Sequence, residues 1–173
     1  MEKATGAKLR IAASAPAQGS RILVGPAACP AEVRERLRRL RGDGYLIRTL
    51  PDGSLALAGN GRDGTAFAVY RFLEQFAGAR WLWPGDLGEV VPKIRDLRVG
   101  TTSIEREPAF VWRDLGPGGA LWGPLDKWAA ERKLGVTEEH QRLQKIWERR
   151  NGFGGVRIYG GHAFGEILPP AQY

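Results

Sequence analysis

Two short apolar runs joined by a turn constrain the fold of this chain more than any other feature. Residues 44–50 and 55–59 are rich in apolar and β-prone side chains, and Pro51-Asp52-Gly53-Ser54 lies between them. Proline presets φ, aspartate bonds its own backbone and glycine accepts positive φ, so this segment favours a tight turn. The pattern predicts a β-hairpin with antiparallel strands.

A helix over residues 65–77 is predicted after the hairpin. The segment 60–65 supplies turn and capping residues, and Gly78 ends the helix. Four apolar side chains recur at i, i+3, i+4 and i+7, and they are Val69, Phe72, Leu73 and Phe76. We expect this stripe to pack on the sheet as core rather than to form a cofactor site.

Shorter segments complete a first predicted unit. These are strands at 8–12, 21–24 and 97–99 and a helix at 31–40. Together with the hairpin and the helix over 65–77 they predict an α+β domain over residues 1–103.

The sequence changes in character after residue 103. It predicts a strand at 108–113, a helix at 137–150 and a strand at 156–159, an order that begins a β/α repeat. The order also fits a small Rossmann-like unit, but no glycine fingerprint between strand and helix supports nucleotide binding. Because a barrel needs about 250 residues, residues 104–173 would form only its incomplete start.

The chain is basic, with a formal net charge of +7 and a pI near 10.0. Much of the excess lies in one cluster, Arg34, Arg36, Arg38, Arg39 and Arg41. Beside apolar residues at helical spacing, these arginines predict the solvated face of an amphipathic helix. A basic nucleic-acid-binding domain is the alternative, but no aromatic residues are interleaved with the arginines. We therefore predict no nucleic-acid partner.

Several absences narrow the function classes. No stretch approaches the roughly 20 apolar residues that cross a bilayer, and the first residues lack the apolar core of an export signal. We expect no membrane partner. Cys29 is the single cysteine, which excludes an internal disulfide and a multi-cysteine metal site. No cofactor is predicted, and the sequence leaves localisation and oligomeric state open.

Residues 64–93 carry a specific pattern of motifs. The motifs are Gly64-Thr65, Val69-Tyr70, Phe72-Leu73-Glu74, Arg80-Trp81, Pro84-Gly85 and Gly88-Glu89-Val90-Val91-Pro92. The pattern resembles the N-terminal domain of α-glucuronidase-like bacterial proteins, and a domain of the same shape precedes the barrel of the β-hexosaminidases, glycoside hydrolase family 20. The resemblance implies an α+β fold, an antiparallel sheet with helices on one face, followed by the first β/α units of a truncated TIM barrel.

The resemblance also implies what the chain lacks and which residues contact substrate. Family members begin with a strand and a helix that are missing here, so we expect an open sheet edge and a partly uncovered face at Phe72 and Phe76. Arg113 ends the run 110–113 as a sugar-binding arginine ends the first barrel strand of β-hexosaminidases. Its alternative role is a surface ion pair with a neighbour such as Asp114.

A second candidate substrate-binding residue is His162, which lies between glycines and Ala163-Phe164 where a second barrel strand would end. It would hydrogen-bond substrate or, alternatively, form a structural hydrogen bond. The tryptophans of this region are candidates for stacking on sugars or for core packing, and they are Trp112, Trp122 and Trp128.

Catalytic carboxyl groups are not evident. Glycoside hydrolysis needs two carboxyl groups, or one with help from the substrate, and nothing pairs the nearby acids Glu107, Asp114 and Glu166. We predict no catalytic and no metal-binding residues. The predicted function is that of a non-catalytic N-terminal fragment of a glycoside hydrolase-like protein with a carbohydrate partner, a polysaccharide, uronic acid or amino-sugar glycoside. The alternative is a stand-alone carbohydrate-binding module that presents Trp81, Trp83 and Arg113.

Overall fold

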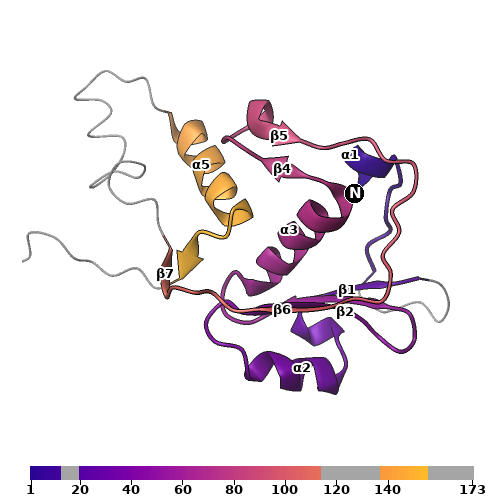
Figure 1. Cartoon of the computed structure of the whole chain (residues 1–173). Coiled ribbons are helices and arrows are strands. Elements are labelled where there is room, and N and C mark those ends of the chain that lie inside the picture. The colour runs from indigo at the N-terminus through magenta and orange to yellow at the C-terminus, as the bar shows by residue number, and fades with distance from the viewer. Residues whose placement is uncertain (13–19, 114–136, 156–173) are drawn as a thin grey trace, which may run out of the picture.

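The computed structural model describes residues 1–12, 20–113 and 137–155, and its centre is a four-stranded sheet (Figure 1). The strands are β1 (Ile22–Val24), β2 (Tyr45–Thr49), β3 (Leu55–Gly59) and β6 (Ser103–Arg106), in the order β1-β3-β2-β6. Strand β2 pairs antiparallel with β3 and with β6, whereas β1 runs parallel to β3. The predicted hairpin is confirmed, but the sheet is mixed rather than antiparallel throughout.

Helices cover both faces of the sheet. The two helices are α2 (Ala31–Arg38) and α3 (Gly64–Ala77). Helix α2 packs on the side of Leu46 and Ala58, and α3 packs on the side of Ile47 and Leu57. Figure 1 shows them on opposite sides of the sheet. Both helices were predicted, but the prediction that helices lie on one face only is wrong.

The physical reason lies in β3, whose five residues Leu-Ala-Leu-Ala-Gly are all buried. A strand with one solvated face alternates apolar and polar residues, whereas a strand covered on both faces is continuously apolar. Because β3 has no polar position, both of its faces need a cover. On the α2 side, Ala56 and Ala58 leave room for Val33 and Leu37 of the helix.

The apolar stripe of α3 packs on the sheet as predicted. Phe72 is only 2% exposed, and Phe76 is partly buried against the same cluster as Ile47. The sheet therefore covers Phe72, and the prediction of a partly uncovered face is wrong at this residue. The arginines at 34, 36, 38 and 39 are exposed, as predicted for the solvated face of α2.

A layer of small elements covers α3 on the side away from the sheet (Figure 1). Its elements are α1 (Glu2–Thr5), β4 (Arg80–Trp81), the 3₁₀ turn η2 (Asp86–Gly88) and β5 (Glu89–Val90). Strands β4 and β5 pair antiparallel. The buried Trp81 meets Tyr70 of α3 edge-on, with 5.4 Å between the ring centroids. An ion pair between Lys3 and Glu89 attaches α1 to β5.

Helix α5 (Glu138–Arg150) packs on this layer and confirms the helix predicted over 137–150. It begins with a capping box, in which the Thr137 hydroxyl accepts from the His140 backbone N–H and the His140 ring accepts from the Thr137 N–H. Near its end the Trp147 indole donates to the Trp81 carbonyl oxygen over 2.9 Å. This hydrogen bond joins α5 to β4.

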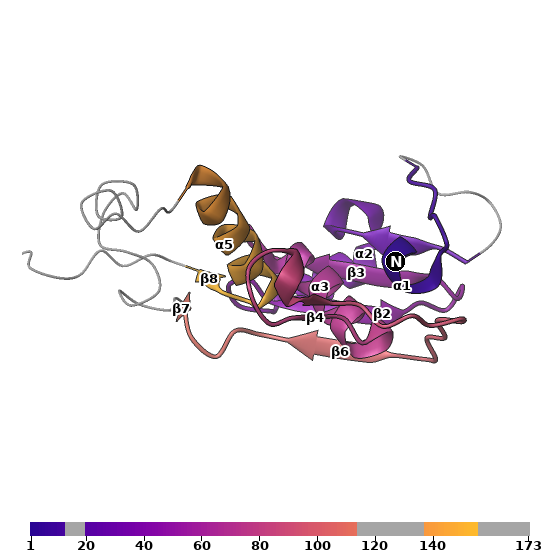
Figure 2. The same ribbon diagram turned by 90° about the horizontal axis from the view of Figure 1, so that it is seen from above.

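The predicted strand at 108–113 is reduced to β7 (Trp112–Arg113), which pairs antiparallel with β8 (Gly154–Gly155). The strands of a β/α repeat run parallel to each other, and β7 forms no such pair among the described residues. The second predicted strand, at 156–159, lies outside the described residues. Figures 1 and 2 place β7 at the end of the molecule away from α1.

Two other predicted strands are not strands in the structure. Residues 8–12 form none, and Ile11 is 98% exposed. Residues 97–99 form no strand either. Leu97 and Val99 pack against the core on the α3 side without pairing to the sheet. The strand that completes the sheet is β6, so the predicted domain boundary at 103/104 falls inside a strand.

Candidate functional site at the end of the sheet

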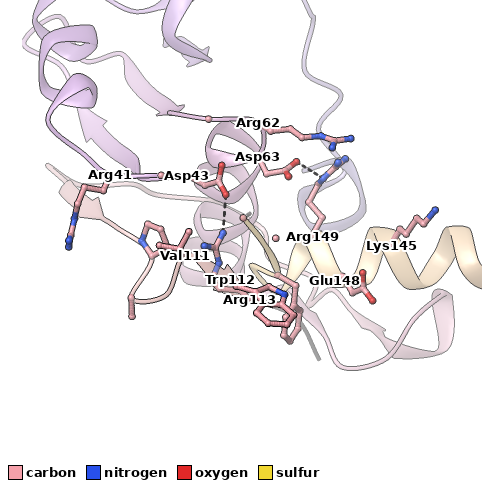
Figure 3. Close-up of a pocket in the computed structure, with 17 residues that line it drawn as sticks. Arg41, Asp43, Arg62, Asp63, Val111, Trp112, Arg113, Lys145, Glu148 and Arg149 are labelled. Carbon is pink, nitrogen blue, oxygen red and sulfur yellow. Dashed lines mark hydrogen bonds and ion pairs between the residues drawn. The ribbon is translucent and has the colours of Figure 1, made fainter. Parts of the chain in front are cut away.

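A pocket of about 740 Å³ lies at one end of the sheet, beside β7 (Figure 3). Four segments line it: the turn before β2, the loop before α3, the chain leading into β7, and the second half of α5 with the turn into β8. The lining residues come from 41–43, 61–63, 108–113 and 145–155.

The Arg113 side chain joins three of these segments. Its Nε donates to the Gly152 carbonyl oxygen over 2.9 Å, and one terminal nitrogen donates to the Phe110 carbonyl oxygen over 2.9 Å. The other terminal nitrogen donates to the Asp43 carboxylate over 3.0 Å. The guanidinium also lies over the Phe67 ring, 5.6 Å from its centroid. Arg113 thus fixes β7 against the turn before β2 and the turn into β8.

Asp43 meets Arg113 from a position 70 residues earlier in the chain. Its side chain is 10% exposed and that of Arg113 is 16% exposed, so each charge depends on the other for compensation. Gly61 lies against this carboxylate. Its φ is +61°, and a Cβ atom there would collide with Oδ1 of Asp43. The site therefore needs glycine both for the backbone conformation and for the missing side chain.

The loop before α3 is held from two sides. The Asn60 amide donates to the carbonyl oxygens of Leu37 and Leu40, which attaches the loop to the end of α2. On the other side, the Asp63 carboxylate pairs with Arg149 of α5 at 2.8 Å. The helices α2 and α5 thereby set the position of this pocket wall.

The pocket wall carries more cationic than anionic side chains. The cations are Arg41, Arg62, Arg113, Lys145 and Arg149, and the anions are Asp43, Asp63 and Glu148. Arg41 pairs at 3.0 Å with Glu107, outside the lining, and its hydrogen bonds lower the pKa of that carboxyl. The described wall therefore has an excess of positive charge.

Trp112 gives the pocket rim an aromatic surface. It is 44% exposed, and its neighbours Phe110 and Val111 are also exposed. An exposed indole offers an apolar face together with a polar N–H edge. Trp81, by contrast, is buried, and Trp83 is 70% exposed but does not line this pocket.

The structure brings one of the two predicted substrate-binding residues, Arg113, to this pocket. Its ionic partner among the described residues is Asp43, whereas Asp114 lies outside them. His162 also lies outside the described residues, as do Trp122 and Trp128. Sugar contacts by Arg113 and His162 stay predictions.

Sequence reasoning missed Asp43, Asp63 and Arg149. They belong to three separate segments, so no local pattern pairs them. One available signal was the position of Asp43 between two glycines, because glycine often marks a place where another segment approaches closely.

Other kinds of site find little support in the part of the chain that the structure describes. There, no group of three or more His, Cys, Asp or Glu side chains could hold a metal ion, and no helix is long and apolar enough to span a membrane. Cys29 is buried, which raises the pKa of its thiol and disfavours the reactive thiolate.

The chain matches no protein-family model, and no curated protein or solved structure is significantly similar to it.

Proposed function

We propose that this chain is a non-catalytic, carbohydrate-binding part of a glycosidase-like protein, and that the pocket beside β7 receives the sugar. The observation that carries the proposal is the half-exposed Trp112 next to a cationic pocket wall. Aromatic rings offer a flat surface to the apolar face of a sugar, and guanidinium groups donate paired hydrogen bonds to oxygen atoms.

The resemblance to α-glucuronidase-like proteins and β-hexosaminidases supports the same proposal. The motif Gly64-Thr65 begins α3, and the loop before that helix lines the pocket. The motifs Arg80-Trp81 and Gly88-Glu89 contribute to β4 and β5, on which α5 packs. The motif residues thus support the two elements that form one wall of the pocket.

Hydrolysis by this pocket is not expected. Two of its three acids, Asp43 and Asp63, are held by arginines, which leaves Glu148 without a second carboxylate at hand among the described lining residues. Glycoside hydrolysis as a rule uses a pair. We expect no release of nitrophenol from nitrophenyl glycosides, and steady release that Glu148→Gln abolishes would show this part of the proposal to be wrong.

Calorimetric titration with neutral and acidic oligosaccharides tests sugar binding. We expect saturable binding to at least one class, and we expect Trp112→Ala to weaken it about tenfold, which corresponds to ~1.4 kcal/mol. Trp83→Ala is the matched control, because it removes an exposed indole outside the pocket. Absence of saturable binding to every oligosaccharide would overturn the proposal.

A stand-alone carbohydrate-binding module is the second candidate. The observation in its favour is a separate exposed apolar group between β4 and β5, in which Leu82 is 68%, Trp83 70% and Leu87 100% exposed. Exposed apolar patches often mark binding surfaces. If this surface binds the sugar, Trp83→Ala will weaken binding and Trp112→Ala will not, so the same two variants separate the candidates.

A further inference from the structure

Two cationic side chains of the pocket wall differ from the others in having no partner within the part of the chain that the structure describes. Arg62 lies in the loop before α3 and Lys145 lies on α5, and both are exposed. Among the described residues neither forms a hydrogen bond or an ion pair. The remaining wall cations are each paired with a carboxylate, and these pairs are Arg41 with Glu107, Arg113 with Asp43 and Arg149 with Asp63. Among the described wall cations, Arg62 and Lys145 are therefore the two without a carboxylate partner.

The paired residues hold these two cations at one pocket. Asp63, the neighbour of Arg62, pairs at 2.8 Å with Arg149 of α5, so the loop before α3 is fastened to the helix that carries Lys145. Figure 3 shows Arg62 and Lys145 on these two separate elements around the same pocket. A ligand in the pocket would meet both elements.

One acid of the wall opposes this charge without removing it. Glu148 pairs with no arginine of the described segments and accepts a hydrogen bond from the Gln144 amide over 3.0 Å. In the described part of the wall, two cations without a carboxylate partner thus lie opposite one carboxylate. A hydroxyl of a neutral sugar can accept a hydrogen bond from either cation, but an oxyanion adds the attraction between opposite charges and can accept two parallel hydrogen bonds from the Arg62 guanidinium.

We infer that the ligand of this pocket carries an oxyanion on its sugar, a carboxylate or a sulfate ester, and that Arg62 and Lys145 select it. The inference rests on the proposed carbohydrate-binding function and assigns the chemical class of the ligand. Arg113 and Asp43 shape the pocket, and Arg62 and Lys145 determine its charge specificity.

The test compares three tetrasaccharides of similar size by calorimetry at physiological salt, ~0.15 M, where distant charges are screened. One is neutral, one is a uronate and one is sulfated. We expect the native chain to bind at least one acidic tetrasaccharide about tenfold more tightly than the neutral one. The variant Arg62→Gln/Lys145→Gln should lose this advantage and keep its affinity for the neutral sugar.

The control variant Arg10→Gln/Arg39→Gln has the same net charge as Arg62→Gln/Lys145→Gln. It removes two exposed cations that do not line the pocket. It should bind like the native chain. Preference for the uronate or for the sulfated sugar identifies the source of the oxyanion, and either result supports the inference. Equal affinity for neutral and acidic sugars, or an equal loss in the control variant, overturns the inference and leaves the proposed function standing. Absence of binding to all three would overturn the proposed function as well.

Discussion

Arg113 and Asp43 connect segments that lie 70 residues apart, and little of either side chain reaches solvent. A buried charge is tolerated while its partner is in place, and removing one partner leaves the other without compensation. Because Arg113 also donates to two backbone carbonyl groups, its loss would release β7 from both neighbouring turns.

A double-mutant cycle measures this connection. Arg113→Met and Asp43→Asn should each lower the free energy of unfolding by about 2–4 kcal/mol, because each leaves one buried charge unpaired. The double variant should lose clearly less than the sum of the two. Urea unfolding gives all four values, and strictly additive losses would show that the two side chains do not stabilise each other.

Gly61 offers a second test at the residue scale. Gly61→Ala should lower the free energy of unfolding by about 2–4 kcal/mol, because alanine is strained at positive φ and its Cβ would collide with Asp43. Gly53→Ala is the matched control: Gly53 has φ +78°, and a Cβ atom added there would have no neighbour within 4 Å, so the expected loss is about 1 kcal/mol. Equal losses at the two positions would show that the contact with Asp43 is unimportant.

At the scale of the secondary-structure elements, α3 is central because it packs on the sheet with one face and carries Tyr70 against Trp81 with another. Its Phe72 is 2% exposed and packs in the core with Ile47 and Leu57. The burial of this one ring therefore links the hairpin to the helix that begins at the pocket.

Truncating that ring should be costly. Phe72→Ala should lower the free energy of unfolding by about 3–5 kcal/mol, which combines the lost transfer energy with the cavity left behind. Leu87→Ala removes a fully exposed side chain and should change stability by less than about 0.5 kcal/mol. Chemical denaturation of both variants checks the pair, and similar losses would contradict the packing of α3 on the sheet.

Local sequence patterns predicted the elements that neighbouring residues determine. The turn at 51–54 and the apolar stripe of α3 are both local, so the hairpin and the helix could be identified from them. The continuous apolar run of β3 also contained the signal for two covered faces, but the same run fits one half of a hairpin equally well.

Long-range pairings could not be predicted in the same way. Strand β1 joins the sheet parallel to β3, and no turn between them fixes that choice. The apolar residues Leu97 and Val99 cover the core without pairing as a strand, which sequence alone does not distinguish from a short strand. Likewise, Asp43 and Arg113 meet only because the whole sheet places their segments side by side.

At the scale of the whole molecule, Glu89 holds three parts of the chain together. It pairs with Lys3 of α1 and, at 3.0 Å, with Arg150 of α5, while it belongs to β5 itself. The hydrogen bond from Lys3 is the main cause that lowers the pKa of Glu89, and the charges of Lys3 and Arg150 act in the same direction against desolvation. A carboxyl group whose pKa is lowered by folding stabilises the folded state at pH values above its ordinary pKa. This contribution is lost as the pH falls through the lowered pKa of the folded state.

The pH dependence of unfolding tests this arrangement. The difference in unfolding free energy between the native chain and Glu89→Gln should be largest near neutral pH. It should shrink as the pH falls below 4.5, the ordinary pKa of a glutamate. Urea unfolding over a series of pH values provides the comparison, and a difference that stays constant with pH would contradict an ionised Glu89 at this junction.

The position of the proposed sugar site can be determined by an NMR titration that follows the indole N–H signals of the six tryptophans. The ligands are the neutral, uronate and sulfated tetrasaccharides, and Trp112→Phe assigns the signal of interest. We predict a saturable shift of the Trp112 signal with the ligand that binds, while the signal of Trp83 stays in place. A saturable shift at Trp83 with none at Trp112, or no shift of any indole signal, would contradict a carbohydrate pocket beside β7.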